Sequence, residues 1–260
     1  MLNNIHIILV GITHPGNIGA AARAMKTMGI SKMRLVQPKL FPNVEATARA
    51  SGADDILANA QVFDTLEESI KDCHLIFGTS TRSRHLTWPT LTPKACAEKS
   101  LKFGGNVAII FGREQSGLTN EELELCHFLV PISTNPTFSS LNVASAVQIL
   151  AYELHESFIK QDESGEIVEL EEPPASAEMM EYFYKHLEQT LIDIEFLDPE
   201  KPKHLMRRLH RLFNRSQPID SELNILRGIL TAAQKAKKAK HETKNNHFSK
   251  KEDTFFTPCN

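Results

Sequence analysis

The sequence predicts an α/β fold, in which a mostly parallel β-sheet with crossover helices is followed by a small helical domain. Over residues 1–158, short β-branched runs alternate with helical patterns, which is typical of parallel strands joined by helices. Residues 159–176 are acidic and contain Gly165, Pro173 and Pro174, a composition typical of a solvated linker. Residues 177–240 hold three helical patterns, which predict a separate helical domain.

Five short apolar runs are the expected strands of the sheet. Several are apolar on successive residues, as strands covered by helices on both faces should be. We therefore expect the sheet to lie inside its domain. The expected strands are residues 6–10, 33–36, 74–78, 107–111 and 128–132.

Helical periodicity predicts six helices in the first domain and three beyond the linker. The last twenty residues, 241–260, are polar and weakly patterned, so we expect a disordered tail. The first six helices are expected at residues 17–28, 43–48, 66–71, 93–102, 120–126 and 141–159. The last three are expected at residues 177–196, 202–213 and 220–240.

Composition limits the class of protein. With 260 residues, 41% hydrophobic and 23% charged, the chain is ordinary for a globular protein. The longest apolar run near the start, residues 5–12, is too short to span a bilayer, so we expect a cytoplasmic protein without a membrane partner. The four cysteines form no CxxC pair, so neither a disulfide framework nor a metal site is expected.

The distribution of charge is more informative than its sum of -3. Residues 162–200 are acidic, with Lys185 as their only lysine or arginine, whereas residues 201–251 are basic. The basic segment predicts a surface for RNA phosphates, and the alternative is a solvated basic face paired with the acidic segment. The arginines concerned are Arg207, Arg208, Arg211 and Arg215.

Three polar segments each follow an expected strand, at the edge where open α/β sheets bind ligands. In the first, residues 14–26, Gly16 and Gly19 would let the backbone approach a ligand. Arg23 lies off the apolar stripe of its helix, so it either faces a substrate or is solvated. A dinucleotide-binding loop would require an acidic residue after the second strand, where this chain has Gln37 and Pro38.

The second and third segments, residues 109–123 and 130–147, have the same position relative to their strands. In the second, Gly112 could admit a flat ligand, and Thr119 and Glu122 form an expected capping box for the next helix. The alternative is an ordinary turn from strand to helix, for which Gly117 and this cap would suffice. In the third, small polar residues precede a helix, and any one of them could be its N-cap. These residues are Ser139, Ser140 and Asn142.

Taken together, the three segments resemble the motifs of the SPOUT methyltransferases, in their order and approximate spacing over residues 1–158. The motifs are Asn-Ile-Gly-x-x-x-Arg, Phe-Gly-x-Glu-x-x-Gly-Leu and Ser-Ser-Leu-Asn-Val. Gly-Thr-Ser-x-Arg-Ser-Arg and Leu-Thr-Asn-Glu-Glu-Leu are similar to the bacterial TrmJ type. This resemblance implies a C-terminal trefoil knot in the sheet domain and a homodimer. It also implies methyl transfer from S-adenosylmethionine to the ribose 2′-oxygen of the cytidine or uridine at position 32 of tRNA.

The resemblance also implies a set of site residues. The cofactor pocket would be formed by Thr79, Ser80, Thr81, Gly112, Ile132, Ser139, Ser140 and Leu141. The catalytic and substrate-side positions would be Asn17, Arg23, Glu114, Ser140 and Asn142. The family account makes Arg23 the base, but a guanidinium has a pKa above about 12. We expect Arg23 instead to bind a phosphate and orient the hydroxyl.

Two further alternatives remain open at this stage. A related SPOUT enzyme could modify rRNA, and a non-enzymatic RNA-binding protein could use the same basic helices. The helix expected after the third segment is apolar over a wide arc. That arc suits either a core plus a dimer interface, or an intramolecular core alone. Its apolar residues are Val143, Val147, Leu150, Ala151 and Leu154.

Overall fold

A computed structural model describes residues 2–80, 88–164, 173–200 and 204–252, with side chains described up to residue 237. The chain divides into two compact units. Unit 1 comprises Met1–Glu178 and Arg211–Ile219, and unit 2 comprises Met179–His210 and Asp220–Asn260.

Unit 1 contains a six-stranded sheet whose order is β3-β2-β1-β5-β4-β6. All pairings between these strands are parallel, as the sequence predicts. Every residue of the two central strands, β1 and β5, is buried. The strands are β1 (Ile5–Val10), β2 (Lys32–Val36), β3 (Gln61–Phe63), β4 (Leu75–Thr79), β5 (Val107–Phe111) and β6 (Phe128–Val130).

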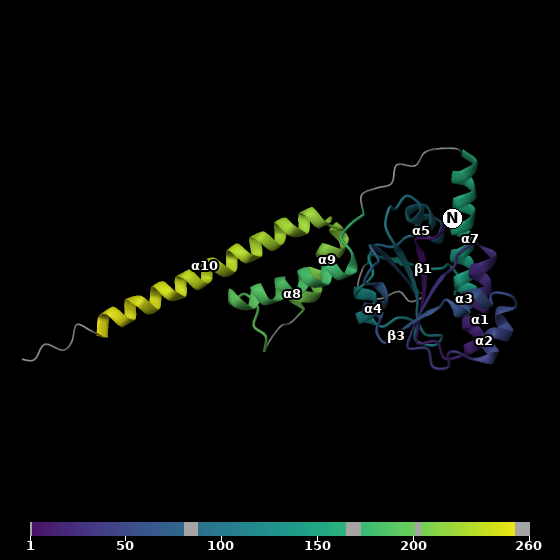
Figure 1. Ribbon diagram of the computed structural model, residues 1–260, viewed down its shortest axis with the longest axis horizontal. Coiled ribbons are helices and arrows are strands. Elements are labelled where there is room, and N and C mark those ends of the chain that lie inside the picture. Colours follow the sequence, from purple (N-terminus) through teal and green to yellow (C-terminus); the bar gives the residue numbers. More distant parts are fainter. Residues whose placement is uncertain (1, 81–87, 165–172, 201–203, 253–260) are drawn as a thin grey trace, which may run out of the picture. The chain divides into compact units, whose positions relative to one another are not determined.

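Helices cover both faces of this sheet, which explains why its central strands are apolar at successive positions. Ile7 and Leu9 of β1 belong to one apolar cluster, and Ile8 and Val10 to the other. The helices α1, α2 and α7 lie on one side of β1, and α4 lies on the opposite side (Figure 1). The helices of unit 1 are α1 (Pro15–Thr27), α2 (Val44–Ala50), α3 (Asp54–Ala58), α4 (Leu66–Ile70), α5 (Pro93–Leu101), α6 (Asn120–Glu124) and α7 (Val143–Ser164).

Two short elements were not predicted. The helix α3 has five residues and β3 has three, and β3 is largely exposed at the edge of the sheet. Neither is long enough to show a helical or alternating period. The other element boundaries differ from the predicted ones by a few residues, except at the end of α7 and at the end of the last helix, α10 (Asp220–Glu252).

Gly19 has a different role from the one expected. A β-carbon on this residue would collide with the carbonyl oxygen of Ala46, so the missing side chain allows α1 and α2 to pack closely. The expectation that Gly19 approaches a ligand is therefore wrong. The sequence could not show this, because Ala46 is distant along the chain.

The apolar arc of α7 is buried within the chain itself. Val143, Val147, Leu150, Ala151 and Leu154 all belong to the larger core cluster, together with residues of α1 and α5. An intramolecular core therefore accounts for this arc. The helix continues to Ser164 instead of ending at residue 159, because the added residues favour helix and Lys160 pairs with Glu156 one turn earlier.

The C-terminal helices are α8 (Ala177–Asp193), α9 (Leu205–Ser216) and α10 (Asp220–Glu252). In unit 2, the ring of Tyr184 stacks on His210 at 3.8 Å between centroids, and Gln234 of α10 donates to Asp193 of α8 at 2.6 Å. The helix α10 extends past the predicted end at residue 240 and into the expected tail. Residues 241–252 lack proline and glycine and are rich in lysine and glutamate, which favour helix.

Candidate active site

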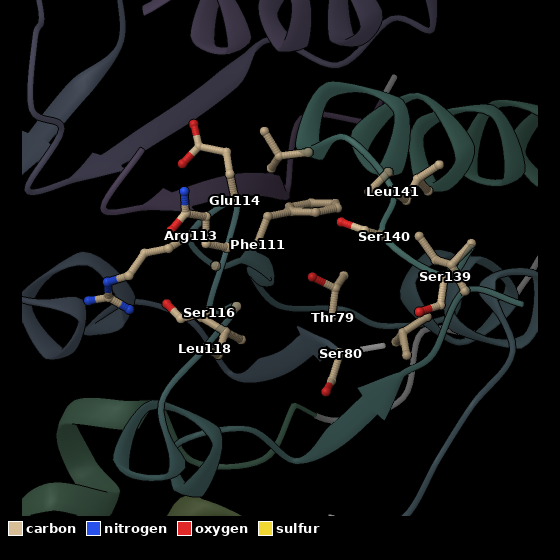
Figure 2. Close-up of a pocket in the computed structure, with 17 residues that line it drawn as sticks. Thr79, Ser80, Phe111, Arg113, Glu114, Ser116, Leu118, Ser139, Ser140 and Leu141 are labelled. Atoms are coloured by element: carbon tan, nitrogen blue, oxygen red, sulfur yellow. The ribbon is translucent and has the colours of Figure 1, made fainter. Parts of the chain in front are cut away.

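A cavity of about 300 Å³ lies at the carboxyl ends of β4, β5 and β6. Figure 2 shows Thr79 at the end of β4, Ser80 directly after it, Phe111 from β5, and Ser139 and Ser140 from the segment before α7 around this cavity. The sequence predicts a ligand site at this edge of the sheet, because all three polar segments follow strands there. The lining residues are Thr79, Ser80, Phe111, Gly112, Arg113, Glu114, Gln115, Ser116, Gly117, Leu118, Val130, Ile132, Ser139, Ser140, Leu141, Val143 and Ala146.

Seven of the eight residues expected in a cofactor pocket line this cavity. The eighth, Thr81, lies outside the described residues. Sequence reasoning missed the apolar part of the wall, in particular Phe111, Leu118 and Val130. Phe111 and Val130 end their strands, and nothing in the sequence distinguishes them from ordinary core residues.

The loop after β5 is closed by its own backbone. The N–H of Arg113 donates to the carbonyl of Gly117 at 3.2 Å, and the N–H of Gly117 donates back at 2.9 Å. A β-carbon on Gly112 would lie 2.6 Å from the carbonyl oxygen of Gly117. Gly112 is therefore needed for this loop closure, a role that the sequence did not indicate, and it also lines the cavity.

Arg113 connects this loop to two neighbouring elements. Its side chain lies across Gly11, where a β-carbon would come within 2.9 Å of Cγ of Arg113. Its guanidinium forms an ion pair with Glu122 at 2.9 Å. Glu122 and Thr119 form the capping box of α6, as the sequence predicts. The ion pair was not predicted, because Glu122 was already assigned to the cap.

Glu114 accepts hydrogen bonds from the loop that precedes α1. The backbone N–H of Thr13 donates to its carboxylate at 3.2 Å, the N–H of His14 at 3.3 Å, and Nδ2 of Asn17 at 2.9 Å. The Thr13 hydroxyl also donates at 3.1 Å. Nδ2 of Asn142 donates to Oδ1 of Asn17 at 3.0 Å. All three polar segments are therefore joined by one hydrogen-bonded chain.

Asn142 is the N-cap of α7. Its Oδ1 accepts from the N–H of Ala144 at 2.9 Å, while its amide nitrogen donates to Asn17. Because one residue supplies the cap, Ser139 and Ser140 are not needed for it. Both line the cavity instead.

Comparison with known proteins identifies the family. Residues 4–152 match the SpoU rRNA Methylase family. The chain belongs to the SpoU methylase family. Residues 178–244 match the C-terminal domain of the tRNA methyltransferase TrmJ. The sheet domain and the helical domain expected from the sequence therefore both have counterparts in TrmJ-type enzymes, and the protein is an RNA methyltransferase.

Relatives support the same assignment over nearly the whole chain. The tRNA (cytidine/uridine/adenosine-2′-O-)-methyltransferase TrmJ of Pseudomonas aeruginosa is 51% identical, over 90% of this chain and 95% of the relative. The tRNA (cytidine/uridine-2′-O-)-methyltransferase TrmJ of Salmonella typhimurium is 48% identical, over 92% of this chain and 100% of the relative. The crystal structure of TrmJ from Z. mobilis matches with a TM-score of 0.77 at 36% identity, covering 87% of this chain and 97% of that one.

Arg23 of this SpoU methylase is apart from the described cavity. It is exposed on α1, and the described residues that line the cavity do not include it. It follows Asn17 by six positions, which corresponds to about 9 Å along the helix and about 240° around it. Asn17, Glu114 and Asn142 are joined by hydrogen bonds, and Glu114 and Ser140 line the same cavity, whereas Arg23 belongs to neither group.

The described residues contain no helix that combines the length and apolar character needed to cross a membrane. Within the same ranges, no group of three or more His, Cys, Asp and Glu side chains is placed to hold a metal ion.

The carboxylate of Glu114 has a lowered pKa. Burial raises this pKa, but the hydrogen bonds from Asn17 and from the N–H groups of His14 and Thr13 outweigh that effect. A carboxylate with a lowered folded-state pKa stabilises the fold above its unfolded-state pKa of about 4.5 and loses that contribution as pH falls through the folded-state value.

We therefore expect Glu114→Gln to lower the free energy of unfolding at pH 7, with a smaller difference from the parent protein at pH 3. The amide cannot accept all of these hydrogen bonds, whereas protonation at low pH weakens them in the parent protein too. Urea denaturation at both pH values measures the difference. If Glu114→Gln lowers the free energy of unfolding by the same amount at pH 7 and at pH 3, the role assigned to this carboxylate is wrong.

Proposed function

We propose that this RNA methyltransferase transfers a methyl group from S-adenosylmethionine to a ribose 2′-hydroxyl in the anticodon loop of tRNA, at position 32. The observation that carries the proposal is the cavity at the ends of β4, β5 and β6, beside the hydrogen-bonded chain of Glu114, Asn17 and Asn142. The names of the relatives support tRNA as substrate and the ribose 2′-oxygen as target. The match of residues 178–244 favours tRNA over rRNA.

The cavity suits a nucleoside cofactor in size and chemistry. A volume of about 300 Å³ is at the lower end of the range for small-molecule sites. Phe111, Leu118 and Ile132 offer apolar surface for an adenine ring, and the hydroxyls of Ser139 and Ser140 offer hydrogen bonds. When bound, S-adenosylmethionine supplies an electrophilic methyl group on a sulfonium.

The polar residues beside the cavity hold the reacting groups in position, which can supply much of the rate. The hydrogen bond between Asn17 and Asn142 orients both side-chain amides, and the hydrogen bond to Glu114 also orients Asn17. Both oxygens of Glu114 already accept hydrogen bonds and its pKa is lowered. We therefore assign Glu114 as a positioning residue and not as the proton acceptor.

The active enzyme is proposed to be a homodimer in which Arg23 of one protomer reaches the cavity of its partner. The separation of Arg23 from the cavity of its own chain supports this arrangement. A planar guanidinium is suited to bind a substrate phosphate and to orient the ribose hydroxyl. The trefoil knot belongs to the same proposal, as does a cytoplasmic location.

Calorimetry with S-adenosylmethionine tests the proposed site directly. We expect one cofactor molecule to bind per chain of the full-length protein, and a wide side chain introduced at Ala146, in the cavity wall, to remove binding. Absence of binding to the parent protein, or undiminished binding to Ala146→Trp, would place the cofactor elsewhere.

The helical region is proposed to bind tRNA through the basic face of α9. Arg208, Arg211 and Arg215 are exposed and follow each other at i, i+3 and i+7, so they share one side of this helix. Phosphate contacts of this kind add affinity at every sequence and are screened by salt. The proposed domains are residues 1–158 for chemistry and 177–240 for RNA affinity, joined by residues 159–176.

Replacing Arg208, Arg211 and Arg215 together with glutamine is expected to weaken tRNA binding by about ten-fold or more at 100 mM salt and to flatten its salt dependence. Fluorescence anisotropy between 50 and 200 mM salt measures both effects. Lys94→Gln is the control, because this lysine is exposed on α5 and pairs with Glu98. An unchanged salt titration would show that this face of α9 does not bind the RNA.

A further inference from the structure

Phe138 exposes its ring beside the cavity. The side chain is 79% exposed, and the two residues that follow it, Ser139 and Ser140, both line the cavity. Adjacent α-carbons are about 3.8 Å apart, so the backbone of Phe138 lies at the cavity rim. An aromatic ring that is exposed beside a cavity is available to stack on a ligand.

Hydrogen bonds before and after Phe138 along the chain hold the turn that carries it. The N–H of Phe138 donates to the carbonyl of Asn135 at 3.0 Å. Oδ1 of Asn135 accepts from the N–H and the hydroxyl of Thr137 at 3.0 and 2.8 Å. The hydroxyl of Thr134 donates to the carbonyl of Ser139 at 3.3 Å. The ring is therefore presented from an ordered turn, which lowers the entropic cost of binding.

The surroundings of the ring are polar. Thr137, Ser139 and Ser140 are exposed on either side of it in the sequence. The core of a protein interface is usually a continuous apolar surface, which these neighbours do not provide. A flat apolar ring next to hydroxyl groups instead suits a nucleobase, which has an apolar face and hydrogen-bonding edges.

We propose that Phe138 stacks on an unpaired base of the substrate RNA, next to the nucleotide that is methylated at the cavity. The inference rests on the proposed function, because it takes the anticodon loop as the ligand. Proteins recognise single-stranded loops largely by stacking their splayed bases on aromatic side chains. Phe138 is thus a substrate-binding residue that contributes to the choice of a loop over a duplex.

The test compares Phe138→Ala, Phe138→Trp and the parent protein for binding to a fluorescein-labelled anticodon stem-loop RNA, without cofactor. Loss of the ring is expected to weaken binding by about five-fold to 150-fold, the equivalent of about 1–3 kcal/mol. Phe138→Trp is expected to restore affinity to within about three-fold, because every base can stack on an aromatic face. Val44→Ala removes an apolar side chain that is 85% exposed on α2, and it should leave affinity unchanged.

A fully paired RNA duplex of the same length separates stacking from other roles. Its affinity should be equal for Phe138→Ala and the parent protein, because its bases are not accessible. Equal affinities of these two proteins for the stem-loop would overturn the proposal. A smaller particle mass for Phe138→Ala in light scattering would also overturn it, in favour of a contact between copies of the chain. Cofactor binding and methyl transfer by the parent protein are measured separately, so failure of the proposed function is recognised independently of these binding results.

Discussion

Arg23→Ala is expected to reduce methyl transfer to below about 1% of the parent activity while S-adenosylmethionine affinity changes by no more than a few-fold. The activity falls because the group proposed to bind the substrate phosphate and orient the hydroxyl is lost, and misplacement of reactants alone can cost about 100-fold. Cofactor affinity persists because the described residues that line the cavity do not include Arg23. Single-turnover methylation of tRNA and calorimetry measure the two quantities.

Two further variants sharpen this prediction. Arg23→Lys should also fail, because an ammonium cannot bind a phosphate and a hydroxyl with one planar fork. Lys26→Ala is the control on the same helix, since Lys26 is already paired with Asp55 at 2.7 Å. Full activity of Arg23→Lys would contradict the proposal that Arg23 binds the phosphate and orients the hydroxyl.

A mixture of two inactive variants tests whether Arg23 acts on the partner. Randomly paired Arg23→Ala and Ala146→Trp chains should recover about a quarter of the parent activity, because half of the dimers then contain one complete site of two. Recovery requires that the cavity of one chain uses Arg23 of the other. A mixture that stays inactive would show that each site is built from a single chain.

Gly112→Ala is the second change with a large expected effect. Its new β-carbon would lie 2.6 Å from the carbonyl oxygen of Gly117, so the loop between them must open. We expect at least a ten-fold loss of S-adenosylmethionine affinity and a melting temperature lower by about 2–10 °C. Calorimetry and thermal denaturation measure these effects.

The matched control is Gly228→Ala. A β-carbon at Gly228 would meet no atom within 4 Å, and alanine in a helix is more stable than glycine by up to about 1 kcal/mol. This variant should therefore bind the cofactor as the parent does, with equal or higher stability. If Gly112→Ala also keeps the cofactor affinity and the melting temperature of the parent protein, the loop closure is not needed for cofactor binding.

Patterns within one element predicted much of the fold. β1 and β5 were predictable because strands buried on both faces are apolar at successive positions. β3 and α3 were missed because a largely exposed strand of three residues and a five-residue helix show no clear period. The length of α10 was underestimated, since helix-favouring polar residues also occur in disordered tails.

At the site, position along the chain predicted which segments meet, but not the contacts between them. Glu114 and Asn17 were both singled out, yet their hydrogen bond joins residues 97 positions apart. The donors of Thr13 gave no signal at all in the sequence. The same limit applies to Gly112 and Gly19, because the atoms that require glycine at these positions belong to other segments.

The most direct test of the central claim is to map the methylated nucleotide in tRNA after incubation with the full-length protein and S-adenosylmethionine. Nucleoside mass spectrometry and fragment mapping identify the modified atom and its position. We predict a 2′-O-methylated cytidine or uridine at position 32, with none formed by Arg23→Ala. A methyl group on a base, or an unmodified tRNA together with a methylated rRNA, would contradict this account.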